Sequence, residues 1–356
     1  MSTQTSLLGS VFVSAASSHR VLLSELASHG HSASLWRASW VRASVAAPRI
    51  PVAWAAQVLP NAVWVKVDQR AALPKAVMSH VCAQLSAVKG PTRVHFVNSR
   101  TAIRSGPFML SILRASAGLP LTLHGRLRAN ETLVQIGQVD DCAAIVSIAS
   151  TDCETREFAL SPFPGGQALL APAARRRGEL VATAATNKLL LAELHLGQRI
   201  GAGDRVLDLG CTPGAWSAVA LERGAVVDGV DRGVPELAHE RFTFHRCDAK
   251  SFAVEPGRFD WLLCDVVESV DQIQEIAERW LAPSAKIVAP GGRPLHFVVT
   301  VKFRDPVAEA HQLVTLIRRA VGWCSDNGSV RGRVGVRHIA AANTGNEVML
   351  FGTIFG

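Results

Sequence analysis

The chain has 356 residues, of which 48% are hydrophobic and 19% charged, and its formal net charge is +8. This length suits two domains better than one compact core, and the composition excludes a disordered or fibrous protein. No apolar run reaches the roughly 18 residues that a membrane-spanning helix needs. No Lys or Arg precedes Arg20, which argues against a secretory signal with its charged start. We therefore expect a soluble, cytoplasmic protein with no membrane partner.

Cysteine and histidine residues give no sign of a metal site. The seven cysteines are an odd number, widely scattered and without a C-x-x-C pair, and the twelve histidines show no ligand spacing. A reduced compartment and no bound metal are the simplest interpretation.

The positive charge is concentrated in the N-terminal part of the chain. Residues 1–150 hold 14 Lys and Arg against 5 Asp and Glu, whereas residues 151–356 hold the other 23 and 24. A basic N-terminal part joined to a near-neutral C-terminal part indicates that the first binds a polyanion electrostatically and that the second is the catalytic unit. A generally basic proteome is the alternative. The expected phosphate contacts are Arg100, Arg104, Arg114, Arg126 and Arg128.

The N-terminal part alternates short extended runs with helical stretches. Leu73, Val77, Val81 and Leu85 recur at four-residue spacing, which predicts a helix over 73–88. Further helices are expected over 21–28 and 106–117. Strands are expected over 11–14, 36–45, 62–68, 92–98, 121–127, 133–137 and 143–148. This is an α+β pattern without repeats.

Proline and glycine mark a linker between the two parts. They occur in Ser161-Pro162-Phe163-Pro164-Gly165-Gly166, and a run of three arginines, 175–177, follows. We therefore divide the chain into an α+β region (1–155), a linker (156–178) and a C-terminal domain (179–356).

The C-terminal domain shows regular alternation of strands and helices. Strands are predicted over 205–209, 225–230, 243–246, 261–265 and 296–301, and helices over 180–196, 214–223, 270–281 and 307–321. Such alternation favours an α/β fold, with a parallel sheet covered by helices on both faces. Two final strands are expected over 334–340 and 347–354.

A glycine-containing turn follows the first of these strands. Residues 206–216 read Val-Leu-Asp-Leu-Gly-Cys-Thr-Pro-Gly-Ala-Trp, a buried strand that enters a turn and then a helix. Such a turn lets a ligand approach the backbone at the carboxyl edge of a sheet, although an incidental tight turn would look similar. A dinucleotide site would need G-x-G-x-x-G, which is absent here. The pattern D-x-G-x-x-P-G instead resembles motif I of class I methyltransferases, whose turn holds the methionine part of S-adenosylmethionine. The resemblance implies that the cofactor is bound by Asp208, Gly210, Pro213, Gly214, Ala215 and Trp216.

Acidic residues end the next three strands. Asp231 lies where a nucleotide ribose would offer its hydroxyls, and Asp248 could accept a hydrogen bond from an adenine amino group. Asp265 ends the fourth strand at the same edge. A single acid could equally cap a helix, but three acids at successive strand ends favour a cofactor site.

Lys302 ends an apolar strand, where an unpaired lysine would be costly unless it had a function. Neither the N/D-P-P-Y/F run of base-amine methyltransferases nor the catalytic Pro-Cys of cytosine-C5 enzymes follows Asp265. Both of those chemistries are therefore disfavoured.

With these residues the C-terminal part resembles the FtsJ-type ribose 2'-O-methyltransferases. Their Lys-Asp-Lys-Glu tetrad matches Lys188, Asp265, Lys302 and Glu347. The resemblance implies a Rossmann-like class I methyltransferase domain that methylates a ribose 2'-hydroxyl. It also implies a catalytic role for the four residues, with Lys302 as the general base or as the group that orients the hydroxyl.

A narrower resemblance is to the bacterial 23S rRNA (cytidine-2'-O)-methyltransferases of the M type. Their Asp-Met-Val-Glu is similar to residues 265–268, Asp-Val-Val-Glu, and their Ser-Pro-Phe linker is similar to residues 161–163. This likeness is specific over 155–356 and only architectural over 1–155. It implies a ferredoxin-like segment and a THUMP-like RNA-binding module before the catalytic domain, with structured RNA, foremost 23S rRNA, as partner. Ala215 departs from the family's usual second glycine.

Three alternatives stay open. The substrate could be tRNA, or the chain could be a catalytically silent RNA-binding or assembly factor that retains the fold. A small-molecule O-methyltransferase is the third, although it would not need a basic region of this size.

Overall fold

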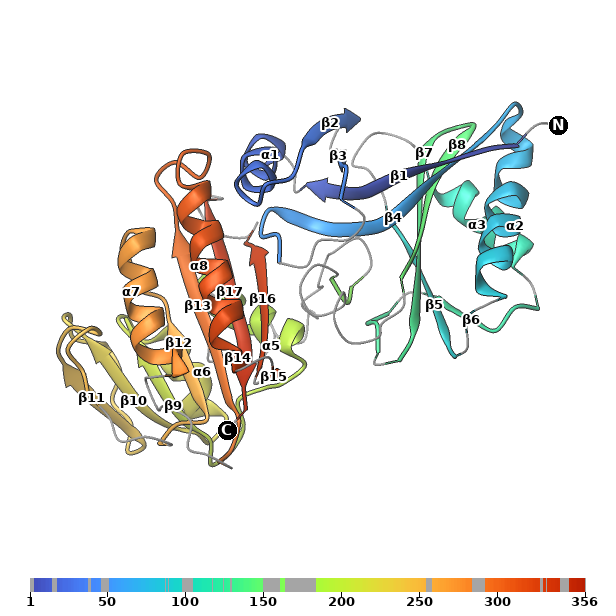
Figure 1. The fold of residues 1–356 in the computed structure, drawn as a ribbon. Coiled ribbons are helices and arrows are strands. Elements are labelled where there is room, and N and C mark those ends of the chain that lie inside the picture. The colour runs from blue at the N-terminus through green and yellow to red at the C-terminus, as the bar shows by residue number, and fades with distance from the viewer. Residues whose placement is uncertain are drawn as a thin grey trace. The chain divides into compact units, whose positions relative to one another are not determined.

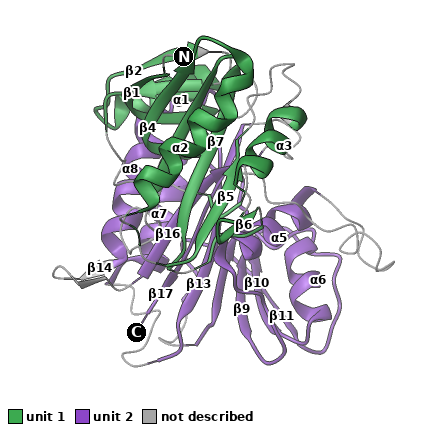
Figure 2. Cartoon of the chain, turned by 90° about the vertical axis from the view of Figure 1, so that its right-hand side faces the viewer, with its two compact units in different colours: residues 1–167 green, residues 168–356 purple. Residues whose placement is uncertain are grey.

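The computed structural model describes most of the chain, in two compact units, residues 1–167 and 168–356 (Figure 2). The described residues are 3–14, 18–37, 40–45, 51–86, 88, 90–97, 105–116, 118–123, 125–128, 130–149, 161–163, 184–253, 258–283, 292–326, 329–330, 332–339 and 346–355. Apart from 161–163, the predicted linker lies outside them, as do Arg100, Arg104 and the three arginines 175–177. Each unit is described below by itself.

Unit 1 is built on one sheet of eight described strands (Figure 1). The order across it is β2-β3-β1-β4-β8-β7-β5-β6. The strands are β1 (Thr3–Ser14), β2 (Ala33–Arg37), β3 (Trp40–Ala43), β4 (Ala55–Val67), β5 (Thr92–Phe96), β6 (Leu121–Leu123), β7 (Thr132–Asp140) and β8 (Ala143–Ala149). Strand β5 pairs parallel with β6 and β7, whereas the other described strand pairs of this sheet are antiparallel. The predicted α+β composition fits this unit, whereas its division into ferredoxin-like and THUMP-like parts stays a prediction.

Helices complete the core of unit 1. They are α1 (His19–Ser28), the 3-10 turn η1 (Arg70–Ala72), α2 (Leu73–Leu85) and α3 (Ser105–Ala115). The predicted stripe on α2 is buried at Leu73, Val77 and Val81, which pack with Ile136 of β7 and Ile112 of α3. Helix α2 contacts both α3 and the strands β4 and β8. These two helices therefore cover one part of the sheet together.

Unit 2 contains a mixed sheet of seven described strands. They are β9 (Arg205–Leu209), β10 (Val226–Asp231), β11 (Phe242–Arg246), β12 (Trp261–Cys264), β13 (Leu295–Lys302), β16 (Gly332–His338) and β17 (Glu347–Ile354), in the order β11-β10-β9-β12-β13-β17-β16. The first five are parallel, as predicted, but β17 runs antiparallel to both β13 and β16. The sequence predicted the last two strands as a terminal pair without a direction; β16 and β17 are antiparallel because the connection between them is too short for a parallel crossover.

Four described helices pack on this sheet in two pairs: α5 (Ala184–Leu196) with α6 (Ala215–Glu222), and α7 (Val270–Leu281) with α8 (Ala310–Trp323). A further short strand pair comprises β14 (Ser325–Asp326) and β15 (Ser329–Val330). The core between α5, α6 and the strands includes Leu189, Val206, Trp216 and Leu263. The carboxyl ends of β9, β10, β12 and β13 meet at one edge of the sheet, where open α/β folds bind ligands. The functional residues predicted from the sequence cluster around this edge.

Candidate active site

The structure brings the four predicted catalytic side chains together. Asp265 directly follows β12, while Lys302 and Glu347 face each other as register partners at the end of β13 and the start of β17. Lys188 comes from the first half of α5. Its Nζ lies 2.7 Å from Glu347 Oε2 and 3.3 Å from Asp265 Oδ2, and Lys302 Nζ lies 2.5 Å from Asp265 Oδ1. The carboxylate of Asp265 is therefore shared by two lysines that come from distant parts of the chain.

Lys302 is held in one position by oxygen atoms. Besides Asp265 Oδ1, its Nζ donates to the backbone oxygens of Asp265 at 3.2 Å and Val266 at 2.9 Å, and to Thr300 Oγ1 at 3.1 Å. Its side chain is still 20% exposed. An amine that is fixed yet accessible can meet a substrate hydroxyl without first losing much conformational freedom.

Lys188 is the more buried lysine, with 8% of its side chain exposed. Burial acts to lower its pKa, but the attraction of Asp265 and Glu347 is larger in sum and leaves the pKa above its ordinary value. The two carboxylates therefore favour the charged form of Lys188. Its position between the two carboxylates suits it to hold them in place.

Thr300 is a fifth member of this cluster that sequence reasoning missed. Its buried hydroxyl donates to Asp265 Oδ1 at 2.5 Å and accepts from Lys302 Nζ. Residues two apart in a strand point to the same face, so position 300 shares a face with Lys302. This alternation was the signal in the sequence that could have identified it.

For the methyl transfer that the resemblance implies, we expect the Thr300→Val variant to lower kcat by about 10- to 100-fold, because Asp265 loses a donor and Lys302 an acceptor. Thr300→Ser, which keeps the hydroxyl, should stay near the wild-type rate. Steady-state kinetics at saturating substrate measures both. Thr353→Val is the control, since Thr353 Oγ1 bonds His296 on the same two strands but away from the cluster. Equal kcat values for the Val and Ser variants would show that the hydroxyl of Thr300 has no positioning role.

The predicted glycine turn lies beside this cluster. Gly210 has a φ of +77°, and a Cβ on it would meet Val266 Cγ1 at 2.7 Å and Val266 N at 3.0 Å. Gly214, with a φ of +123°, is the N-cap of α6, which Ala215 begins. Pro213 is exposed in the same turn. Two left-handed glycines at the start of a helix leave the backbone open to a ligand, which fits the methionine part of S-adenosylmethionine.

Asp208 and Trp216 lie behind the turn. Asp208 is 1% exposed and accepts a hydrogen bond from Ser217 Oγ at 2.6 Å, while Trp216 is 3% exposed and donates through Nε1 to Ala185 O at 2.6 Å. These contacts tie β9 to α6 and α6 to α5. A direct contact of either side chain with the cofactor stays a prediction, and the observed contacts indicate that both support the turn.

Burial raises the pKa of Asp208 to about 7, although the Ser217 hydrogen bond opposes the shift. A carboxyl whose folded pKa lies above its unfolded value of about 3.9 destabilises the fold where it must ionise. The destabilising effect of Asp208 on the folded state therefore becomes smaller as the pH falls from about 7 towards 4. We expect Asp208→Asn, which keeps an acceptor for Ser217, to stabilise unit 2 by up to about 4 kcal/mol at pH 8 and by less at pH 5. Urea unfolding at the two pH values measures the difference, and an equal effect at both would contradict it.

Asp231 and Asp248 occupy the predicted strand ends. The two oxygens of Asp231 accept from the backbone of Thr212 at 3.0 Å and Gly233 at 2.8 Å, so this carboxylate links the end of β10 to the glycine turn. Each oxygen keeps a second lone pair for a ribose hydroxyl. Asp248 accepts from Lys250 N at 2.8 Å and is half-buried. The acids thus lie along one sheet edge, and this arrangement fits a bound nucleoside.

The described residues show neither a metal site nor a membrane-spanning helix. They include no group of three His, Cys, Asp or Glu side chains that could hold a metal ion. No described helix combines the length and apolar character needed to cross a membrane.

Comparison with known families gives this geometry a context. The family model described as FtsJ-like methyltransferase matches residues 185–328, which include Lys188, the glycine turn, Asp265 and Lys302. Unit 2 contains an FtsJ-like methyltransferase domain. Glu347, the fourth member of the tetrad, follows the matched stretch and reaches the FtsJ-like site through β17.

Curated relatives carry a more specific name. Ribosomal RNA large subunit methyltransferase M from Edwardsiella ictaluri is 39% identical over 87 residues, which make up 24% of this chain and 23% of the relative. The protein of that name from Halorhodospira halophila is 31% identical over 119 residues, 33% of each chain. The matched stretches span a quarter to a third of the relatives' length.

A solved structure, 1,6-didemethyltoxoflavin-N1-methyltransferase from Burkholderia thailandensis, has a TM-score of 0.35 at 18% identity. It covers 53% of this chain and 92% of its own. This likeness is too low to add to the assignment.

Proposed function

We propose that the chain is an S-adenosylmethionine-dependent RNA methyltransferase that modifies a ribose 2'-hydroxyl, with 23S rRNA as its substrate. The observation that carries this proposal is the convergence of Lys188, Lys302 and Glu347 on or beside the carboxylate of Asp265. The cluster stands at the sheet edge that also carries the glycine turn. A methyl donor held by the turn would lie next to a fixed amine.

The cofactor, when bound, supplies a methyl group on a positively charged sulfur. The residues of the chain must then align a weakly nucleophilic hydroxyl and handle its proton. Lys302 has one of two roles: as an ammonium its Nζ orients the hydroxyl oxygen by donating to it, or, once Nζ has released a proton to solvent, the neutral amine takes the hydroxyl proton as the O–CH₃ bond forms and the S–CH₃ bond breaks. Asp265 and Thr300 fix that amine, Lys188 holds Asp265, and Glu347 in turn holds Lys188. Asp231 and Asp248 would hold the ribose and the adenine amino group.

The choice of RNA is supported by two further observations. The excess of positive charge lies in residues 1–150, which matches a polyanionic substrate bound outside the catalytic unit. The curated relatives are named as methyltransferases of large-subunit ribosomal RNA. An enzyme with this substrate would act in the cytoplasm, where ribosomes are assembled.

The test is methylation of purified RNA classes by the purified chain. We expect labelled methyl groups from S-adenosylmethionine in 23S rRNA and, after nuclease digestion, mass spectra that show 2'-O-methyl nucleosides. If tRNA were labelled and rRNA were not, tRNA would be the substrate in place of 23S rRNA. If the labelled nucleosides carried the methyl group on the base, the proposal of ribose methylation would be wrong. No transfer to any RNA, with the cofactor bound, would favour the silent RNA-binding factor.

A further inference from the structure

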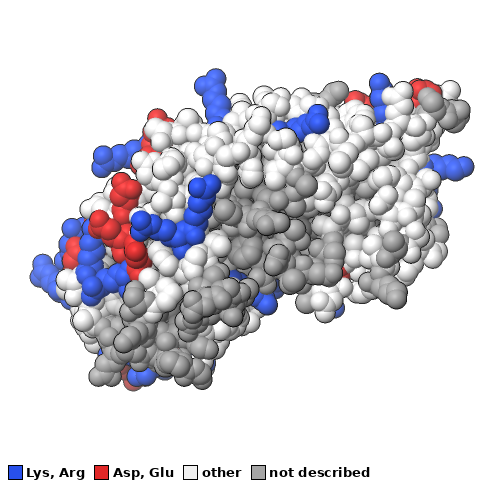
Figure 3. All heavy atoms as spheres, in the orientation of Figure 1, with Lys and Arg blue, Asp and Glu red and all other residues white. Residues whose placement is uncertain are grey.

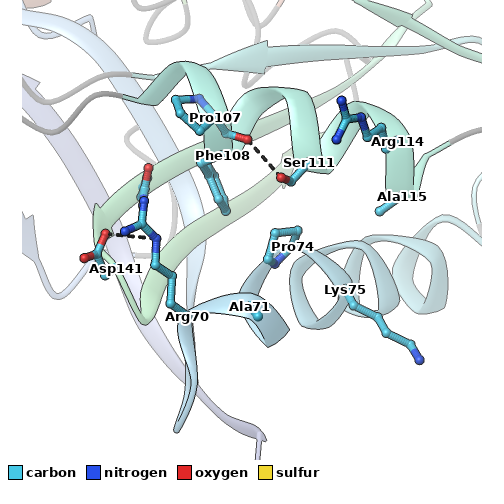
Figure 4. A pocket seen from close by; sticks show the side chains of 11 residues that line it. Arg70, Ala71, Pro74, Lys75, Pro107, Phe108, Ser111, Arg114, Ala115 and Asp141 are labelled. Atoms are coloured by element: carbon cyan, nitrogen blue, oxygen red, sulfur yellow. Dashed lines mark hydrogen bonds and ion pairs between the residues drawn. The ribbon is translucent and has the colours of Figure 1, made fainter.

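A groove in unit 1 lies between the paired helices α2 and α3. It is open to solvent, has a volume of about 720 Å³ and is lined by residues of η1, α2, α3, β7 and the β7–β8 turn (Figure 4). That volume falls within the range of about 300–1,000 Å³ found for ligand sites. Pro74, Pro107 and Ala115 give it small rigid walls, so the hollow does not depend on long side chains folding away.

Three cations line this groove against one acid. Lys75 and Arg114 are exposed, and within the described part of the chain neither has a carboxylate at ion-pair distance. Arg70 pairs with Asp141 at 3.6 Å, but the two side chains are 67% and 61% exposed. Such an exposed pair is worth little and can exchange for a phosphate. Figure 3 shows the Lys, Arg, Asp and Glu side chains on one face of the molecule.

The inner wall of the groove adds an unsatisfied acceptor. Gln138 is 9% exposed, its Nε2 donates to Asp140 O at 3.2 Å, and its Oε1 has no hydrogen-bond partner among the described residues. A buried acceptor without a donor costs free energy, and turning the Gln138 amide toward the groove would offer this oxygen to a ligand hydroxyl. A ligand with both phosphates and hydroxyls suits this wall and these cations, and RNA has both through its 2'-OH.

We propose that the α2–α3 groove is the site at which unit 1 binds the RNA backbone, with Arg70, Lys75 and Arg114 on phosphates and Gln138 on a ribose hydroxyl. This inference rests on the proposed RNA substrate and specifies where the substrate is held. Of the five arginines predicted to touch phosphate, it retains Arg114. It adds Arg70 and Lys75, which the sequence did not single out.

The experiment measures binding of a fluorescein-labelled single-stranded RNA to the full chain at several salt concentrations. The variant Lys75→Glu/Arg114→Glu should raise Kd by about tenfold or more and flatten the slope of log Kd against log salt by roughly 1.4, two single-strand phosphate contacts. Arg20→Glu, in α1, is the matched control and should change Kd little, since α1 packs on β2 and β3 instead. Binding of S-adenosylmethionine should be unchanged in every variant.

A variant that is expected to bind RNA more tightly keeps the test valid if the double Glu variant fails to fold. Asp141→Asn removes the acid that competes for Arg70 and should tighten RNA binding by about two- to fivefold. Single-stranded DNA of the same sequence should bind more weakly than the RNA, and ATP should not compete at concentrations near the RNA Kd.

The outcomes distinguish a failure of the proposed RNA groove from a failure of the proposed methyltransferase function. If the wild type binds RNA while the double Glu variant behaves like Arg20→Glu, the groove is not the site, and the proposed function stands. If Asp141→Asn weakens binding, or if ATP displaces the RNA, a phosphate-backbone groove is likewise refuted. If the wild type binds the cofactor but no RNA, the proposed function itself fails.

Discussion

Lys302→Ala is expected to lower the methylation kcat by about 10³-fold or more while S-adenosylmethionine binds as before. The variant removes the only cluster member whose amine is both fixed by Asp265, Val266 and Thr300 and still 20% exposed. General acid–base groups contribute about 10²–10⁴-fold, and the lost alignment of the hydroxyl adds to this. Single-turnover methylation of 23S rRNA gives the rate, and isothermal titration calorimetry gives the cofactor affinity.

A matched control separates this effect from loss of the fold. Arg319→Ala removes another cation of unit 2, whose pair with Glu278 at 2.6 Å lies on the surface, and should leave the rate near that of the wild type. Lys302→Arg keeps the charge but not the shape of the donor, and we expect little rescue. Turnover by Lys302→Ala within a few-fold of the wild type would remove Lys302 from the mechanism.

Two members of the cluster, Asp265 and Lys302, could be predicted because each stands at the end of a strand with a clear apolar pattern. The apolar runs before Asp265 and Lys302 gave the strand ends, and parallel strands bring such ends to one edge. The partners across the sheet were harder, because the pairing of Lys302 with Glu347 depends on where β17 inserts and in which direction. Only the resemblance to a known family supplied Glu347.

Other contacts could not be read from local patterns. Asp208 occupies a motif position associated with the cofactor, yet its hydrogen bond to Ser217 depends on how α6 packs behind β9. The α2–α3 groove needs the spatial pairing of helices separated by β5, so Arg70 and Arg114 gave no common signal in the sequence. Counting charges predicts that residues 1–150 bind a polyanion, but it does not say on which surface.

Gly210→Ala should weaken S-adenosylmethionine binding by at least about 100-fold. A left-handed backbone costs a residue with a Cβ roughly 1–2 kcal/mol, and here the new methyl would also lie 2.7 Å from Val266 Cγ1 and 3.0 Å from Val266 N. Relief of that overlap must move the glycine turn or the segment after β12. The same movement would displace Asp265, since it precedes Val266, so kcat should fall together with the affinity.

Gly203→Ala isolates the overlap from the backbone cost. Gly203 has a φ of +81°, almost that of Gly210, but a Cβ there would meet no atom within 4 Å. Both variants should lose a similar 1–2 kcal/mol of stability from the backbone alone, whereas only Gly210→Ala should lose the cofactor, as measured by calorimetry beside urea unfolding. Equal cofactor affinity in the two variants would mean that the turn tolerates a side chain and that the cofactor does not approach the backbone at Gly210. The glycine would then be required by the turn's conformation alone, and the methyl donor would have to be placed elsewhere along the sheet edge.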